Sequence, residues 1–234
     1  MKVITAISPK GGVGKSTLLY NLAKAFHDIG MKVLVLDPDT NQSLYRAYER
    51  RIDFLETESG VDIDYPTVST FTPAKLLKRQ IEDLGKGYDI VIVDTYGKIE
   101  GYQIALLEFV DLVIVPTQPN QSAINNALDT CQYIEGVREE NDGYPIYGVS
   151  LLNFAKNGVE ERQYRKNFDG VNTIFDMQTR PYGKAYKLAD RKGLSVTELD
   201  KIGLLKKVDE ESCKNAAIDM RRLCKEIIEV VEEL

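Results

Sequence analysis

The run of residues 10–17, Lys-Gly-Gly-Val-Gly-Lys-Ser-Thr, constrains the fold of this chain more than any other feature. It follows an apolar segment typical of a short buried strand and precedes a segment whose apolar residues recur every three to four positions, as in an amphipathic helix. Glycines let the backbone wrap closely and point N–H groups at an anion, and the helix start adds the positive end of its dipole. This order of strand, loop and helix predicts a phosphate-binding loop.

The lysines of the loop differ from the ordinary pattern G-x-x-x-x-G-K-[ST]. That pattern would require glycine at position 9, where the chain has Pro9, and the chain instead carries a second lysine, Lys10, at the front of the loop. We expect Lys15 to contact the β- and γ-phosphates and the Ser16 hydroxyl to bind Mg²⁺. The remaining residues expected around the phosphates are Gly11, Gly12, Val13, Gly14 and Thr17.

Val- and Ile-rich segments alternate with helix-like segments along the 234 residues. This alternation predicts one α/β domain over residues 1–234, with a mostly parallel, twisted sheet and helices on both faces. No apolar run approaches the ~20 residues that span a bilayer, and the N-terminus lacks an export signal, so we expect a cytoplasmic protein. Strands are expected at residues 3–7, 32–36, 89–93, 112–115 and 146–152, with a possible one at 171–175, and helices at 16–29, 43–58, 73–84, 99–109, 121–140, 159–168, 181–192 and 209–234.

Polar residues follow four of the expected strands. In a parallel sheet covered on both faces, ligands bind beyond the carboxyl ends of the strands, so these residues are candidates for chemistry. Asp37 and Asp39 follow the second strand, and Asp94 follows the third, at the Walker-B position. Carboxylates there suit Mg²⁺, which takes few direct protein ligands. The alternative for residues 37–43 is a turn that caps the next helix.

Together these motifs resemble the ParA/MinD family of deviant Walker-A ATPases, and most closely the short ParA proteins that partition plasmids. The resemblance implies that Lys10 reaches the phosphates of a second subunit in a dimer that sandwiches ATP. It also implies that Asp39 activates the attacking water, that Asp37 holds a Mg²⁺-bound water and that Asp94 belongs to the Mg²⁺ site. Gly97 would give the segment after Asp94 its flexibility.

Three residues depart from the family pattern at these strand ends: Thr40, Asn41 and Tyr96. They leave open a protein that binds ATP and dimerises but hardly hydrolyses it. The chain has no N-K-x-D segment for guanine, and the resemblance implies adenine, with the loop of residues 116–120, which includes Pro119, near the base and Asn153 in contact with it. Both residues are equally compatible with ordinary turns.

Positive charge is concentrated late in a chain whose formal net charge is −6. Residues 162–207 hold eleven Lys or Arg against five Asp or Glu. Residues 180–196 resemble a late segment of the short ParA proteins, which implies non-specific DNA binding by the dimer. Lys184, Lys187 and Arg191 are spaced to share one helix face, although a solvated charged face is the alternative. The full set expected to bind DNA is Arg180, Lys184, Lys187, Arg191 and Lys192.

The C-terminal segment bears on whether the protein binds a membrane. Residues 226–234 hold four glutamates and no basic residue, so we expect no membrane binding, and we expect the apolar stripe before them to pack on the domain or a partner chain. His27 is expected on a helix surface, and Cys131, Cys213 and Cys224 as buried apolar residues.

The resemblance implies a ParB-like, centromere-bound adaptor, while related ATPases that position protein cargo remain an alternative.

Overall fold

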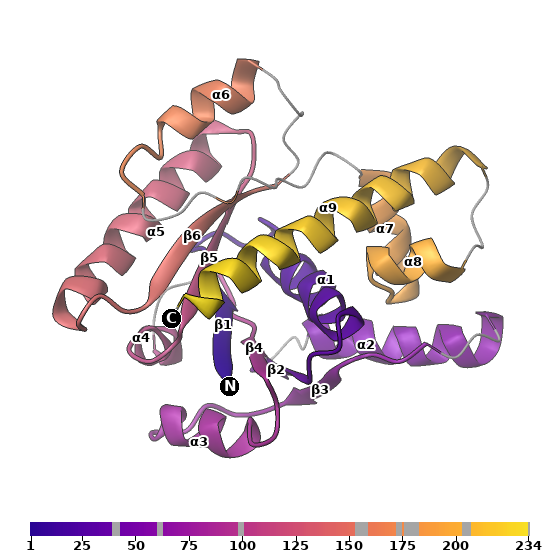
Figure 1. The fold of residues 1–234 in the computed structure, drawn as a ribbon, viewed down its shortest axis with the longest axis horizontal. Helices are drawn as coiled ribbons and strands as arrows, with labels where there is room; N and C mark the ends of the chain where they lie inside the picture. Colours follow the sequence, from indigo (N-terminus) through magenta and orange to yellow (C-terminus); the bar gives the residue numbers. More distant parts are fainter. Residues whose placement is uncertain are drawn as a thin grey trace.

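Six parallel strands form a sheet in the order β3-β2-β4-β1-β5-β6 (Figure 1). This arrangement comes from a computed structural model that describes residues 1–38, 43–59, 63–97, 101–152, 159–171, 175, 183–202 and 207–233. The central strand β1 pairs with β4 on one side and β5 on the other. The strands are β1 (Lys2–Ala6), β2 (Val33–Asp37), β3 (Thr67–Thr70), β4 (Ile90–Val93), β5 (Leu112–Thr117) and β6 (Ile146–Leu151).

Helices cover both faces of the sheet (Figure 1). One face packs against helices that include α1, α2, α7, α8 and α9, and the other against helices that include α3, α4 and α5. The helix bounds are α1 (Lys15–Asp28), α2 (Ser43–Phe54, followed by a π-helical turn at Leu55–Ser59), α3 (Leu77–Leu84), α4 (Tyr102–Leu107), α5 (Gln121–Glu140), α6 (Val159–Lys166), α7 (Gly183–Lys192), α8 (Val196–Ile202) and α9 (Lys207–Glu232).

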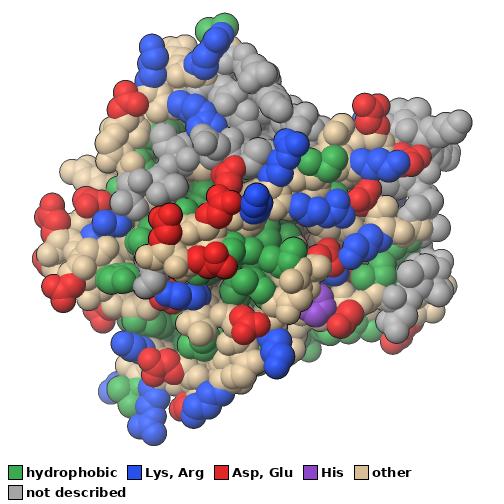
Figure 2. Space-filling model, viewed as in Figure 1, with side chains coloured by type: hydrophobic (Ala, Val, Ile, Leu, Met, Phe, Trp, Pro, Cys, Tyr) green, Lys and Arg blue, Asp and Glu red, His purple; other side chains and the backbone are tan. Residues whose placement is uncertain are grey.

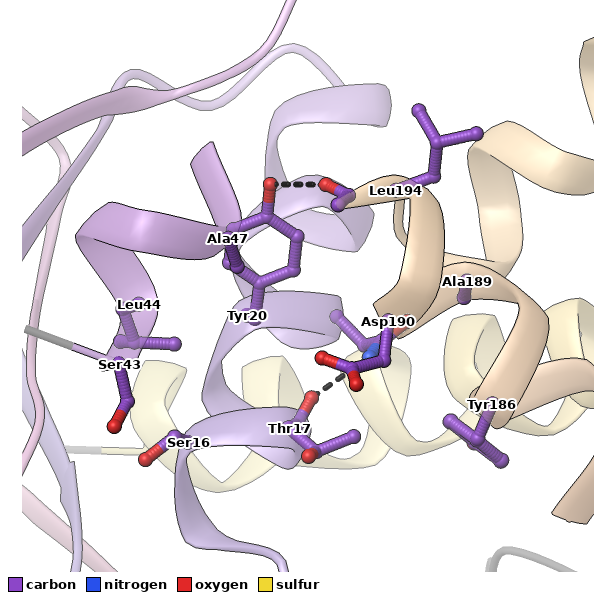
Figure 3. A pocket seen from close by; sticks show the side chains of 12 residues that line it. Ser16, Thr17, Tyr20, Ser43, Leu44, Ala47, Tyr186, Ala189, Asp190 and Leu194 are labelled. Carbon is purple, nitrogen blue, oxygen red and sulfur yellow. Dashed lines mark hydrogen bonds between the residues drawn. The ribbon is translucent and has the colours of Figure 1, made fainter. Parts of the chain in front are cut away.

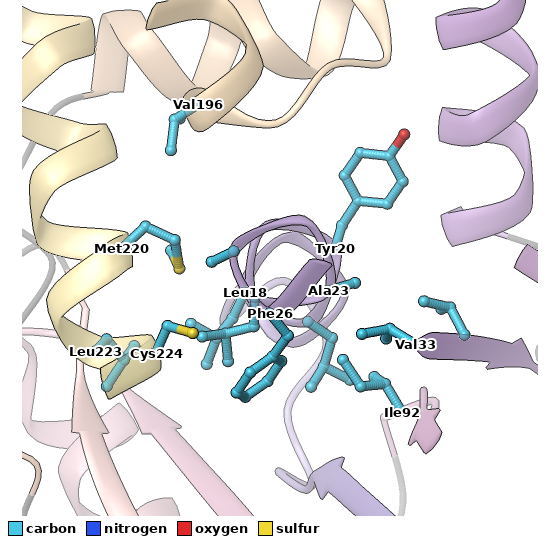
Figure 4. Close-up of a cluster of buried hydrophobic side chains, with 14 of the residues drawn as sticks. Leu18, Tyr20, Ala23, Phe26, Val33, Ile92, Val196, Met220, Leu223 and Cys224 are labelled. Carbon is cyan, nitrogen blue, oxygen red and sulfur yellow. The ribbon is translucent and has the colours of Figure 1, made fainter. Parts of the chain in front are cut away.

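The two cores follow from the two-residue period of the strands. Ile4 and Ile92 point toward α1 and α9, whereas the neighbouring Val3 and Val91 point to the opposite face. Figure 4 shows α1 between strands of the sheet and α9. Phe26 of α1 is buried in the core that these elements share. Residues of these strands are buried on both faces, which explains their nearly continuous apolar sequence.

The expected α/β architecture is confirmed, including five strands and the bounds of α5. Two elements were not predicted. β3 holds one core residue, Val68, among threonines and a serine, too weak a pattern to distinguish from a loop. α8 begins after Ser195, whose hydroxyl accepts from the backbone N–H of Glu198 while the Glu198 carboxylate accepts from the Ser195 N–H. That Ser-x-x-Glu capping box was available in the sequence.

The middle of the possible strand at residues 171–175 lies outside the described residues. Val171 and Phe175, at its ends, are not in a strand, and Phe175 packs against Gly148 in the core. α3 begins at Leu77, four residues later than the expected start at residue 73, and α4 begins at Tyr102 rather than at residue 99.

The apolar stripe of α9 packs on the domain, which is one of the two arrangements that the sequence predicted. Its six residues, Cys213, Ala217, Met220, Cys224, Ile227 and Val231, are all buried. Figure 2 shows acidic side chains over the C-terminal end of this helix, and both basic and acidic side chains along the rest of it. In the described part of the chain, no helix is both long enough and apolar enough to cross a bilayer.

The cysteines and the histidine lie where the sequence placed them. Cys131, Cys213 and Cys224 are free and buried, and burial raises the pKa of Cys131 and Cys224 to about 12. His27 is half-buried on α1, where its Nε2 lies 3.2 Å from a carboxylate oxygen of Asp64.

Candidate functional site

The loop between β1 and α1 has the conformation that its glycines permit. Gly12 and Gly14 have φ angles of 76° and 105°, in the left-handed region that side chains rarely adopt, and Gly14 directly precedes α1. The Lys15 side chain is buried, and its Nζ donates to the carbonyl oxygens of Ser8, at 3.3 Å, and of Lys10, at 3.5 Å. The Lys15 ammonium therefore lies within the curve of the loop.

Lys10 stands at the front of this loop, as the sequence predicted. The residue is exposed, together with Gly11 and Gly12 beside it. The two loop lysines thus occupy different environments: Lys15 faces the loop backbone, and Lys10 is accessible from outside the subunit.

Ser16 and Asp94 meet at the carboxyl ends of β1 and β4. The Ser16 hydroxyl donates to Oδ2 of Asp94 at 2.6 Å, and the backbone N–H of Thr95 donates to Oδ1 at 2.8 Å. Burial raises the pKa of Asp94 to about 6; the charge of Asp37 acts in the same direction, while the hydrogen bonds and the charge of Lys15 oppose it. Two carboxylates and a hydroxyl are hard oxygen ligands, and a buried carboxylate with a raised pKa is one that a cation would stabilise. These residues fit Mg²⁺.

Asp37 also organises the start of α2. Its Oδ2 accepts from the backbone N–H groups of Leu44, at 2.9 Å, and Tyr45, at 3.0 Å, two donors that a helix start would otherwise leave unsatisfied. The capping that the sequence offered as an alternative is therefore present at Asp37. Asp39, Thr40 and Asn41 lie outside the described residues, so the role expected for Asp39 stays a prediction.

The segment after Asp94 approaches the phosphate loop closely. A Cβ atom at Gly97 would lie 3.0 Å from the backbone nitrogen of Gly11, so only glycine fits without displacing the loop. Tyr96, beside it, is 38% exposed and its ring tilts against that of Tyr102. Glycine is thus required here for close approach, a reason that the sequence pattern did not reveal.

A pocket of about 240 Å³ opens beside the loop. Pro119 is not among the residues that line it, and the neighbouring Asn120 caps α5 by accepting from the N–H of Ala123. Asn153 lies outside the described residues. Gln118 does line the pocket, and its Nε2 donates to the carbonyl of Val13 at 3.1 Å. The lining residues are Val13, Gly14, Thr17, Leu18, Gln118, Leu152, Gly183, Tyr186, Lys187 and Met220.

The loop expected near the base, residues 116–120, does reach this pocket through Gln118, which directly follows β5 at the edge of the sheet where ligands bind. Sequence reasoning missed the contributions of Tyr186 and Met220. Tyr186 and Met220 come from α7 and α9, and no strand-end pattern points to them.

A second pocket, of about 120 Å³, lies between α1, α2 and α7 (Figure 3). It is lined on one side by Ser16 and Thr17 and on the others by Ser43 of α2 and Asp190 of α7. The Tyr20 hydroxyl crosses to α7 and donates to the carbonyl of Gly193 at 2.7 Å. The start of α2 and the end of α7 therefore both border Ser16.

The basic residues of α7 differ in their surroundings. Lys184, Lys187 and Arg191 are exposed, as their shared helix face predicted, but Lys187 also lines the pocket beside the loop. The Nζ of Lys192 lies 3.8 Å from the centre of the Phe54 ring, in cation–π geometry. Arg180 lies outside the described residues.

Comparison with known proteins finds a matching family and curated relatives. A family model for the CobQ/CobB/MinD/ParA nucleotide binding domain matches residues 4–232. The VirC1 protein of Rhizobium rhizogenes is 31% identical over 147 residues, which cover 62% of this chain and 62% of that protein. The chain spans less than two thirds of the length of the first curated relatives that it matches.

Two solved structures share the fold. The septum site-determining protein MinD from Pyrococcus horikoshii OT3, complexed with Mg-ADP, has a TM-score of 0.66 at 16% identity and covers 97% of this chain and 95% of its own. A putative plasmid partition protein from Borrelia burgdorferi B31, bound to AMPPNP, has a TM-score of 0.58 at 20% identity and covers 94% of this chain and 97% of its own. The chain belongs to the CobQ/CobB/MinD/ParA family of nucleotide-binding domains.

Proposed function

We propose that this chain is a Mg²⁺-dependent ATPase of the ParA type, acting as a single domain of residues 1–234. It forms a dimer around ATP, binds DNA in that state and releases it after hydrolysis. The observation that carries the proposal is the hydrogen bond from Ser16 to the buried carboxylate of Asp94, directly behind a phosphate loop that presents Lys10 to the outside.

The phosphates of ATP would lie on the loop backbone from Gly11 to Thr17, with Lys15 on the β- and γ-phosphates. Ser16 and Asp94 would hold Mg²⁺, and Asp37 would orient a water bound to it. When bound, Mg²⁺ neutralises charge on the phosphates. Adenine would lie toward Pro119 and Asn153, an expectation that rests on the family resemblance.

Asp39 would accept a proton from the attacking water as its oxygen bonds to the γ-phosphorus and ADP leaves with the bridging oxygen. Two described residues that flank residues 39–42 support a place for Asp39 near the phosphates. Asp37 lies close enough to Asp94 to raise its pKa, and Ser43 lines the same pocket as Ser16.

Lys10 would complete the site of the second subunit. Its exposure at the front of the loop supports this role, because a side chain must leave its own subunit to reach a neighbour's phosphates. Each nucleotide would then be held by Lys15 of its own subunit and by the partner's Lys10. Dimer formation would therefore require a nucleotide whose γ-phosphate is present.

Helix α7 would bind DNA without regard to sequence. Lys184 and Arg191 are exposed and line neither pocket, so they are the best placed of the described members of the proposed set. The set also includes Arg180, which lies outside the described residues. Phosphate contacts of this kind give salt-sensitive binding with dissociation constants on the order of 10⁻⁴–10⁻⁶ M. This would hold the dimer on the nucleoid, and a ParB-like adaptor would stimulate hydrolysis and release it.

Two alternatives concern what the nucleotide cycle serves. The related MinD is a septum site-determining protein, which favours a positioning ATPase with a protein cargo. Thr40, Asn41 and Tyr96 depart from the family pattern and favour a switch that binds ATP with little hydrolysis.

Phosphate release tests the ATPase activity. With ATP and Mg²⁺ the wild type should release phosphate, faster when DNA and the adaptor are added, and Lys15→Ala and Asp39→Ala should not. Intact ATP binding with no release under any of these conditions would favour the switch.

DNA retention tests the role of α7. The double variant Lys184→Glu/Arg191→Glu should dimerise with ATP as the wild type does but lose ATP-dependent retention on DNA. Retention that survives both charge reversals would mean that this face is only solvated.

A further inference from the structure

The first turn of α7 forms one wall of the pocket beside the phosphate loop. Gly183, Tyr186 and Lys187 line this pocket, at spacings of three and four residues that place them on one side of the helix. Gly14 and Thr17, at the end of the loop and the start of α1, line the same pocket. A nucleotide whose phosphates lie on the loop would therefore meet this part of α7 with its sugar or base.

We propose that Lys187 binds the nucleotide and not DNA. This inference rests on the proposed nucleotide binding and assigns a further residue to that site. The pocket wall also contains the apolar side chains of Leu18, Leu152 and Met220, which suit the faces of a purine. A lysine ammonium has three donors and no acceptor, so it is satisfied by oxygen and nitrogen acceptors, which the sugar and the base of a nucleotide both offer.

The neighbouring cations of α7 have different surroundings. Lys184, one turn earlier, and Arg191, one turn later, are exposed and line neither pocket. Lys192 lies over Phe54. Lys187 is thus the basic residue of α7, within the described chain, that borders the phosphate loop. The same helix would then hold DNA with some cations and sense the nucleotide with another.

The test measures ADP binding by isothermal titration calorimetry, with Mg²⁺ and without DNA. ADP is used so that dimer formation around ATP does not affect the affinity. The variants are Lys187→Met, which keeps the length of the side chain, Lys187→Arg, which keeps its charge, and Lys184→Met as the matched change on the outer surface of the same helix.

A hydrogen bond to a charged group contributes about 1.5–3 kcal/mol, so Lys187→Met should raise the dissociation constant for ADP about tenfold or more. Lys187→Arg should restore most of the affinity, and Lys184→Met should stay within about twofold of the wild type. At saturating ATP, Lys187→Met should still be retained on DNA.

Two results would overturn the assignment. One is wild-type affinity for ADP in Lys187→Met, and the other is loss of DNA retention in that variant at saturating ATP, whatever its affinity for ADP. A wild-type protein that binds no ADP would instead contradict the proposed function itself, so the two failures are distinguishable.

Discussion

The buried carboxylate of Asp94 contributes to how the stability of the ligand-free protein depends on pH. Its pKa is about 6 in the folded state, because burial disfavours the charge, against 3.8 for an ordinary aspartate. The folded state therefore binds more protons than the unfolded state between about pH 4 and pH 6, so the free energy of unfolding falls as pH rises through that window. Above it, the charged carboxylate costs about 3 kcal/mol.

Replacing this carboxylate should remove that pH dependence. In Mg²⁺-free and nucleotide-free protein, Asp94→Asn should have a higher free energy of unfolding than the wild type near pH 7. Near pH 4 the free energies of unfolding of the two proteins should be closer to each other. Urea unfolding at both pH values gives the free energies. A difference between the two proteins that does not change with pH would contradict the account.

Gly97 is a position where backbone proximity restricts the residue type. Gly97→Ala would place a Cβ atom 3.0 Å from the Gly11 nitrogen and push on the phosphate loop, so ADP affinity should fall about tenfold. Gly136→Ala on α5 is the matched control, because nothing lies within 4 Å of a Cβ atom there. Equal ADP dissociation constants for the two variants, by calorimetry, would rule out the close approach as a constraint on binding.

Helix α2 connects the nucleotide site to α7 and α8. Asp37 caps its first turn, and near its other end Arg51 donates to Glu198 of α8 at 2.6 Å, with both side chains buried. Glu198 also accepts from the Ser195 hydroxyl at 2.9 Å. A Cβ atom at Gly193 would lie 2.2 Å from the carbonyl oxygen of Ala47, so α7 ends in direct contact with α2.

Removing one partner of a buried ion pair leaves the other uncompensated, so Arg51→Met should lower the free energy of unfolding by about 3–5 kcal/mol. The adjacent Arg50 provides the control: it pairs with Asp190 at 3.1 Å on the surface, so Arg50→Met should cost about 1 kcal/mol or less. Urea unfolding of both variants measures the difference. Comparable losses would show that the buried pair has no special role.

Elements with strong periodicity were predictable, and those fixed by tertiary contacts were not. α1 and α5 were found because their apolar residues repeat over several turns, whereas β3 carries one apolar core residue and depends on pairing with β2. The spacing of basic residues on α7 predicted a shared exposed face. It could not predict that Lys192 packs over Phe54, because the partner lies on another helix.

At the scale of the whole molecule, the parallel sheet explains why the proximity of Ser16 and Asp94 was predictable. Its strands end at one edge, so residues that follow β1 and β4, far apart in sequence, meet as Ser16 and Asp94. The pocket beside the loop was not predictable, because α7 and α9 complete it from late in the chain. Asp39 and Asn153 lie outside the described residues, and their roles remain predictions.

The charge of the molecule is unevenly distributed. The C-terminal end of α9 is acidic, while both basic and acidic side chains follow the rest of that helix (Figure 2). The net charge of −6 would oppose DNA binding by the whole surface, so retention should depend on the local face of α7 and fall steeply with salt.

The dimer around ATP is the central claim, and its mass in solution tests it most directly. Light scattering after size exclusion, with Mg²⁺ and a non-hydrolysable ATP analogue, should give about twice the 26.4 kDa of one chain, and one chain alone with ADP. Lys15→Ala should stay monomeric without binding nucleotide, and Lys10→Ala should bind the analogue but dimerise poorly. A wild type that binds the analogue as a monomer, or a Lys10→Ala variant that dimerises normally, would contradict the role of Lys10 across the interface.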